Sequence, residues 1–197
     1  MIIVLEGVDG VGKTTVARIM NDKIPLSNML KLSGAPKNVT DPAWMSEIYY
    51  SLFPFLVEQG SKSNLILDRG WVSELVYMPI FRGPDYNVDY LRPFMKMLHR
   101  NVDVTYFYLT ANFKIIASRI EKKKKQQPNE KHMDLYTAER IVKGYNNWFQ
   151  SPAEGERKVH VATDGLTPDE IADLIIGECG IELSKPDDTY HTVGGGK

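Results

Sequence analysis

Short apolar runs alternate along the chain with longer segments in which apolar residues recur every three or four positions. The short runs predict strands buried on both faces, because polar or turn residues bound a continuous apolar stretch. They cover residues 2–5, 65–67, 104–109 and 159–162, with 29–32 as a weaker fifth. The longer segments predict helices over residues 13–21, 44–58, 88–99, 112–125, 135–149 and 168–178. This alternation indicates an α/β fold with a mostly parallel, five-stranded sheet flanked by helices.

Two segments break the alternation. Residues 121–132 have almost no apolar content and predict a mobile loop, or a basic lid over about residues 119–133. Residues 184–197 contain three consecutive glycines near their end and predict a disordered tail. We therefore expect a single domain over residues 1–183.

Composition narrows the class of protein. A chain of 197 residues suits one domain, and 43% apolar residues are enough for a sizeable core. The 24 basic and 25 acidic residues give a net charge of −1, which disfavours a stable nucleic-acid partner. The single cysteine, Cys179, cannot form an internal disulfide and fits a reducing compartment. No apolar run approaches the roughly 20 residues that span a bilayer, and the first residues lack the basic leader of a signal peptide. We expect a cytoplasmic protein with no membrane partner, and a homodimer remains open.

The stretch after the first predicted strand carries the most specific motif. It reads Gly7-Val8-Asp9-Gly10-Val11-Gly12-Lys13-Thr14-Thr15 and fits G-x-x-x-x-G-K-S/T at every fixed position. Glycines let backbone N–H groups approach phosphate oxygens, and the following helix directs its positive end at the anion. Lys13 can reach the β- and γ-phosphates, and the Thr14 hydroxyl can ligate Mg²⁺. Residues Gly7, Gly10, Val11, Gly12, Lys13, Thr14 and Thr15 are therefore the predicted ATP site. The alternative is a glycine turn followed by a chance Lys-Thr pair.

Among P-loop proteins, the sequence favours a small kinase. A GTPase needs Asn-Lys-x-Asp after a later strand, and Thr110-Ala111-Asn112 follows the strand at 104–109 instead. A helicase-type ATPase is normally larger. The small size favours a kinase that acts on a small acceptor.

A second motif follows the predicted strand at 65–67. That strand delivers Asp68 and Arg69 to the carboxyl edge of the sheet, where ligands bind in such folds. Asp68 can hold a water of the Mg²⁺ shell, and Arg69 can clamp an anion with its planar guanidinium. The alternative is a salt bridge at the end of a strand.

These motifs together resemble the thymidylate kinase family of P-loop nucleoside monophosphate kinases over roughly residues 1–180. Ser73 and Tyr77 stand at the family's spacing, as do Ala117-Ser118-Arg119-Ile120 and Asp164-Gly165. The resemblance implies phosphorylation of a deoxynucleoside monophosphate by ATP with Mg²⁺. The implied catalytic residues are Lys13, Asp68, Arg69 and Arg119, with one of the lysines at 122–125 reaching the phosphates.

The resemblance also implies an acceptor site. Asp9 stands at the family position that contacts the sugar 3′-hydroxyl. Arg69 stands at the position that holds the acceptor phosphate, and Tyr77 at the position that crowds the sugar 2′ position. Ser73 belongs to the same set. Tyr145 lies where the family has a tyrosine near the acceptor, and Trp44 is the best-aligned aromatic to stack on the base. Core packing is the alternative for both.

The sequence departs from the family at three places, one of which is that the predicted helix at 44–58 has no clear counterpart of the family's arginine beside the acceptor base. Residues 33–37 replace its Arg-Glu-Pro stretch, and Glu74 stands where relatives carry an amide that faces the base. An ionised glutamate offers only acceptors, so it suits guanine or another amino-bearing base better than thymine. We therefore expect dTMP by resemblance and dGMP, or another amino-bearing deoxynucleotide, by Glu74. The alternative is that Glu74 points into an ion pair or solvent.

Two further functions stay open. A deoxynucleoside kinase phosphorylates a neutral hydroxyl and benefits from a carboxylate base, and its pattern has glutamate where this chain has Asp68. A monophosphate acceptor is already anionic, so positioning and charge screening suffice. The third candidate, a regulatory or nucleic-acid-binding P-loop ATPase, fits poorly with the short, near-neutral chain.

Overall fold

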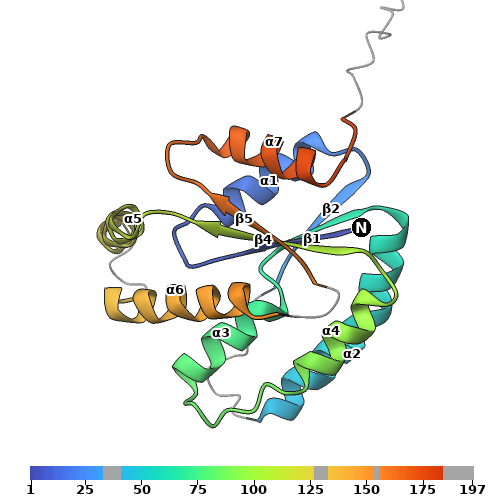
Figure 1. The fold of residues 1–197 in the computed structure, drawn as a ribbon, viewed down its shortest axis with the longest axis horizontal. Helices are drawn as coiled ribbons and strands as arrows, with labels where there is room; N and C mark the ends of the chain where they lie inside the picture. The colour runs from blue at the N-terminus through green and yellow to red at the C-terminus, as the bar shows by residue number, and fades with distance from the viewer. Residues whose placement is uncertain (33–40, 127–132, 153–155, 184–197) are drawn as a thin grey trace, which may run out of the picture.

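The computed structural model describes residues 1–32, 41–126, 133–152 and 156–183. Five strands form one sheet in the order β2-β3-β1-β4-β5, and all four pairings are parallel (Figure 1). The strands are β1 (Ile2–Glu6), β2 (Ser27–Lys31), β3 (Asn64–Asp68), β4 (Val104–Thr110) and β5 (Arg157–Ala162). The predicted α/β fold with a five-stranded parallel sheet is confirmed, including the weaker strand candidate, which corresponds to β2.

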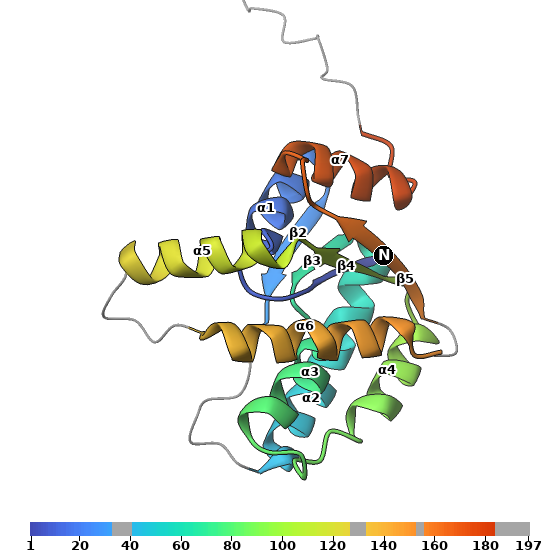
Figure 2. The same ribbon diagram turned by 60° about the vertical axis from the view of Figure 1, so that its left-hand side comes forward.

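Helices cover both faces of this sheet. They are α1 (Lys13–Lys23), α2 (Pro42–Lys62), α3 (Trp71–Phe81), α4 (Leu91–His99), α5 (Phe113–Gln126), α6 (Leu135–Gln150) and α7 (Pro168–Glu178). Helices α1 and α7 lie together on one face, whereas α2, α3, α4 and α6 lie on the other (Figure 1). Helix α5 lies beyond the end at which the strands finish, and Figure 2 shows it from its side. None of the described helices is both long and apolar enough to cross a membrane.

Helix α3 was not among the predicted helices, because its sequence lacks an amphipathic pattern. Its residues are buried on several sides, and Pro79 lies inside it. Trp71 opens the helix, is fully buried, packs edge-on against Phe94, and donates a 2.7 Å hydrogen bond from Nε1 to the hydroxyl of Tyr106. The helix therefore begins at a fixed point directly after Arg69, and this fixes the side chains of its first turns.

The predicted helix at 112–125 and the predicted loop or lid at 121–132 overlap, and the structure confirms the helix, so the loop is wrong for residues 121–126. Helix α5 continues through Gln126, since lysine and glutamate are good helix formers and Lys124 pairs with Glu121 at 2.8 Å, one turn away. Residues 127–132 lie outside the described residues, as do the predicted tail at 184–197 and the family departure at 33–37.

The central strands bring the two motifs together. Strand β1 lies between β3 and β4, and Leu5 is in register with Asp68. The backbone N–H of Arg69 then donates to the carbonyl of Leu5 at 3.1 Å. The loop after β1 and the turn after β3 therefore lie side by side at the carboxyl edge of the sheet.

Candidate active site

The loop after β1 is shaped by its glycines. Gly7, Gly10 and Gly12 have φ of 140°, 86° and 106°, in the region that side chains disfavour. A Cβ on Gly7 would lie 2.4 Å from the carbonyl oxygen of Leu109, closer than any real contact. The loop can therefore press against β4 and enter α1 at Lys13 only with glycine at these positions.

Lys13 lies beneath this loop rather than extending into solvent. It is 5% exposed and donates hydrogen bonds to the carbonyls of Gly7 at 2.7 Å and Val8 at 2.9 Å. Burial, with the nearby Arg69 charge, lowers the pKa of Lys13 to about 7. Phosphate groups bound in the loop would favour the charged form of Lys13, and their oxygens would accept its hydrogen bonds, as in other P-loops.

Thr14 and Asp68 form the part of the site that suits a divalent cation. The Thr14 hydroxyl donates to Oδ2 of Asp68 at 2.5 Å, and Nζ of Lys31 lies 3.6 Å from the same oxygen. Asp68 is 1% exposed, and its Oδ1 has no hydrogen-bond partner among the described residues. The described residues contain no cluster of three or more His, Cys, Asp or Glu that would hold a metal by themselves. A hydroxyl beside an unpartnered carboxylate oxygen fits Mg²⁺, which keeps several waters and binds few protein groups.

Two cavities adjoin the loop. The first, here the P-loop cavity, has a volume of about 450 Å³. Its lining is rich in cations and comprises Asp9, Gly10, Gly12, Lys13, Thr14, Thr15, Lys31, Asp68, Arg69, Arg119 and Lys123. Of the lysines at 122–125, the one that lines it is Lys123. Five cationic side chains around one cavity suit more than one phosphate group.

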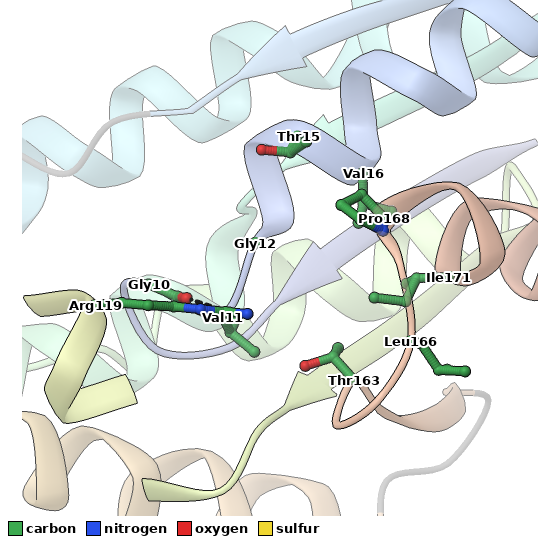
Figure 3. A pocket seen from close by; sticks show the side chains of 10 residues that line it. All are labelled: Gly10, Val11, Gly12, Thr15, Val16, Arg119, Thr163, Leu166, Pro168 and Ile171. Carbon is green, nitrogen blue, oxygen red and sulfur yellow. Dashed lines mark hydrogen bonds between the residues drawn. The ribbon is translucent and has the colours of Figure 1, made fainter. Parts of the chain in front are cut away.

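The second cavity, here the side cavity, has a volume of about 290 Å³ and lies between the loop and the connection from β5 to α7 (Figure 3). Arg119 lines both cavities, and its Nη1 donates to the carbonyl of Gly10 at 2.8 Å. On the opposite side lie Leu166, Pro168 and Ile171. An apolar wall that faces a guanidinium plane suits the ring of a nucleobase.

Arg69 joins the P-loop to α3. Its guanidinium donates to Oδ1 of Asp9 and lies 4.9 Å from the centroid of the Tyr77 ring. Its backbone has φ of 72°, a left-handed conformation that is unusual for a residue with a side chain. The structure thus brings Asp9, Arg69 and Tyr77 together.

Glu6 holds the start of α3 in place, a role that sequence analysis missed. This carboxylate is fully buried and accepts hydrogen bonds from the Gly70 N–H at 2.9 Å, the Ser73 hydroxyl at 2.8 Å and the Tyr145 hydroxyl at 2.9 Å. The Ser73 N–H adds a bond of 3.3 Å, and burial raises the pKa of Glu6. Ser73 and Tyr145 therefore belong to one network. The available signal was a carboxylate at the end of an otherwise apolar buried strand.

Glu74 lies on the same helix, one residue beyond that network. It is 2% exposed, and its Oε2 has no hydrogen-bond partner among the described residues. Burial, and then the charge on Glu6, raise the pKa of Glu74 to about 7. The alternative that Glu74 points into solvent is therefore excluded.

Trp44 is the predicted site residue that the structure does not bring into these contacts. It lies on the first turn of α2 and is 38% exposed. Tyr49 is the buried aromatic of that helix, where burial and then the charge on Glu74 raise its pKa. Lys31 is a cation of the P-loop cavity that sequence analysis also missed, because a lysine at the end of a short polar strand carries no motif.

Comparisons with known proteins give structural similarity alone. No protein-family model matches the chain, and no curated protein matches its sequence. The YorR protein of Bacillus subtilis, solved in complex with phosphorylated GDP, is 21% identical, with a TM-score of 0.67 over 91% of this chain and 96% of that one. Thymidylate kinase from Candida albicans is 20% identical, with a TM-score of 0.60 over 94% and 95%. Deoxyadenosine kinase from M. mycoides is 15% identical, with a TM-score of 0.58 over 91% and 99%.

The structural similarity is thus not specific to thymidylate kinase, the family that the sequence motifs resemble. Thymidylate and deoxyadenosine kinases both match over nine-tenths or more of the chain. At these identities the similarity does not distinguish between acceptors. The chain has the fold of the P-loop nucleotide kinases.

Proposed function

We propose that the protein is a nucleoside monophosphate kinase that transfers the γ-phosphate of ATP to a deoxynucleoside monophosphate, giving the diphosphate. One observation carries the proposal: a single cavity joins the P-loop residues Lys13 and Thr14 to Arg69, which is held between Asp9 and Tyr77. An arginine at that place can present a second phosphate to the first.

The chemistry that this cavity favours is positioning and charge screening. Lys13 and Arg119 would screen the phosphates of ATP, and Arg69 would hold the acceptor phosphate with paired N–H groups. Thr14, and Asp68 through water, would hold Mg²⁺, which when bound neutralises charge on the phosphate oxygens. No strong base is needed, since the attacking phosphate oxygen is already anionic.

The acceptor side supports a deoxynucleotide. Asp9 would contact the 3′-hydroxyl, and the Tyr77 ring, packed against Arg69, would crowd the 2′ position. By the resemblance, Glu74 would face the base, and it leaves both dTMP and dGMP as candidate acceptors. ATP is the co-substrate, and we assign the enzyme to the cytoplasm, where nucleotide pools and a reducing environment suit a free Cys179.

A panel of acceptors with MgATP, read as ADP formed, tests the proposal. We expect ADP formation to require a deoxynucleoside monophosphate, with Lys13→Ala as the inactive control. Phosphorylation of nucleosides but not of monophosphates would identify a deoxynucleoside kinase. ADP formation without any acceptor would identify an ATPase.

A further inference from the structure

Three polar atoms, one on the first turn of α3 and two in the connection from α3 to α4, are buried without partners among the described residues. They are Oε2 of Glu74 and the hydroxyls of Tyr86 and Tyr90, none of which has a hydrogen-bond partner among the described residues. Burial, and then the Glu74 carboxyl, raise the pKa of both tyrosines, so the three groups lie near one another. Buried polar atoms without partners are costly, and a group of them indicates a polar ligand.

A second buried carboxylate, Glu6, lies close by, because it accepts hydrogen bonds from Ser73, the residue before Glu74. Burial raises the pKa of Glu6, but this carboxylate accepts four hydrogen bonds, from Gly70, two groups of Ser73, and Tyr145, which oppose that rise by stabilising its ionised form. A second charge beside it is disfavoured, and burial together with Glu6 raises the pKa of Glu74 to about 7. Oε2 of Glu74 accepts no such bond among the described residues, so of the two carboxyls Glu74 is the one that binds a proton more readily near neutral pH.

The other groups that face Glu74 do not change charge in this range. The charge of Arg82, the C-cap of α3, opposes the rise in the pKa of Glu74 but does not cancel it. Tyr49 from α2, and Tyr86 and Tyr90 from the following connection, stay neutral because burial raises the pKa of each hydroxyl. These hydroxyls can donate or accept, so they adapt to either state of the carboxyl.

The two states of Glu74 complement different bases. An ionised carboxylate presents two acceptors, which match the adjacent N1–H and N2–H₂ donors of guanine. A protonated carboxyl presents one donor and one acceptor, which match the N3–H and O4 of thymine as an amide does. The mismatched combination leaves a buried group unpaired, and such sites discriminate strongly.

We propose that Glu74 is a specificity-determining residue that reads the acceptor base in two protonation states, selecting dGMP when ionised and accepting dTMP when protonated. The proposal rests on the proposed function and names its substrates. It makes the preference between the two deoxynucleotides a function of pH.

The test is the ratio of kcat/KM for dGMP to kcat/KM for dTMP between about pH 6 and pH 8. Ionisations common to both assays, including those of ATP, Lys13 and the acceptor phosphate, cancel in this ratio. If each base is accepted by one form of Glu74, the ratio rises about tenfold per pH unit, or about 100-fold over the range. Glu74→Gln, whose amide mimics the protonated form, should favour dTMP at every pH with a constant ratio. Glu139→Gln, an exposed position on α6, is the matched control and should follow the wild type.

A second readout needs no variant. Binding of dGMP and of dTMP is measured by calorimetry at about pH 7 in buffers of different ionisation enthalpy. We expect binding of dTMP to take up more protons than binding of dGMP, with a difference approaching one proton.

The outcomes distinguish failure of this inference from failure of the proposed function. If both monophosphates are phosphorylated but the ratio changes less than about threefold over the range, or changes equally in Glu74→Gln, Glu74 does not read the base by protonation. Equal proton uptake for both nucleotides leads to the same conclusion. If no monophosphate is phosphorylated at any pH, it is the proposed function that fails.

Discussion

The two sides of the candidate site differ in how their polar groups are satisfied. On the P-loop side, Lys13 is bound to two backbone carbonyls, Thr14 to Asp68, and Arg119 to Gly10. On the α3 side, Glu74, Tyr86 and Tyr90 each keep a buried polar atom without a partner among the described residues. Lys13, Thr14 and Arg119 are thus bonded within the protein, although Oδ1 of Asp68 on the same side also lacks a partner among the described residues, whereas on the α3 side the unpartnered atoms gather around Glu74.

This difference indicates which side of the site a local motif can encode and which side can determine specificity. A loop whose groups bond to one another can be encoded by a short local motif and used for any nucleoside triphosphate. A site with unsatisfied groups carries a cost in the free protein, and that cost lets it reject a ligand with the wrong pattern. Substitutions on the two sides should therefore affect different quantities.

The largest expected effect is on the P-loop side. Lys13→Ala should lower kcat by a factor on the order of 10³, about 4 kcal/mol, because the lysine screens the transferring phosphates. The protein should still fold, with some loss of melting temperature because the carbonyls of Gly7 and Val8 lose their donor. Lys114→Ala, an exposed lysine on α5, is the control. Near-normal turnover in a folded Lys13→Ala protein would contradict the P-loop assignment. It would also contradict the comparison drawn between the two sides of the site.

The second effect is on stability and belongs to the α3 side. The pKa of Glu74 is raised from 4.5 to about 7 by burial, so between these values the folded state binds a proton that the unfolded state releases. Stability contributed by this proton is therefore lost as pH rises toward the folded pKa. Glu74→Gln should be more stable than wild type by up to about 3 kcal/mol above pH 7, with a difference that vanishes near pH 4. Urea denaturation at the two pH values measures the difference in the free energy of unfolding. An equal difference at both would show that ionisation of Glu74 does not destabilise the folded state.

The third effect separates the two substrates. Arg69→Ala should lower kcat/KM for the acceptor about 100-fold, because it removes the paired donors for the acceptor phosphate. ATP affinity by calorimetry should change less than about threefold. Arg100→Ala, an exposed arginine at the opposite end of the sheet, is the control. Equal losses for both substrates would assign Arg69 to the ATP side or to the fold.

The smallest effect concerns the sugar. Tyr77→Ala should reduce the preference for deoxy over ribo acceptors about tenfold, since the ring that crowds the 2′ position is removed. Tyr77→Phe retains that ring and should keep the preference. The measurement is the ratio of kcat/KM for matched deoxy and ribo monophosphates. An unchanged ratio in Tyr77→Ala would exclude the ring from the sugar site.

The same contrast explains how much could be predicted from the sequence. Strands β1 and β4 and the loop at Gly7 follow from apolar runs and a contiguous motif, both of which are local signals. Helix α3 was missed because it is buried on several sides and has no polar face to give a period of 3.6 residues. The network around Glu6 joins residues up to 139 positions apart, a distance over which a single sequence carries no pairing signal.

The backbone of Arg69 has a consequence for the history of this protein. A left-handed conformation costs a side-chain-bearing residue about 1 kcal/mol or more, a cost that glycine does not bear. Selection for thermal resistance alone would therefore favour glycine at this position, where φ is 72°. An arginine offsets that cost only through its guanidinium, which contacts Asp9 and Tyr77 and, under the proposed function, would hold the acceptor phosphate. In a lineage that no longer needs the proposed function, we expect this arginine to be open to replacement by glycine.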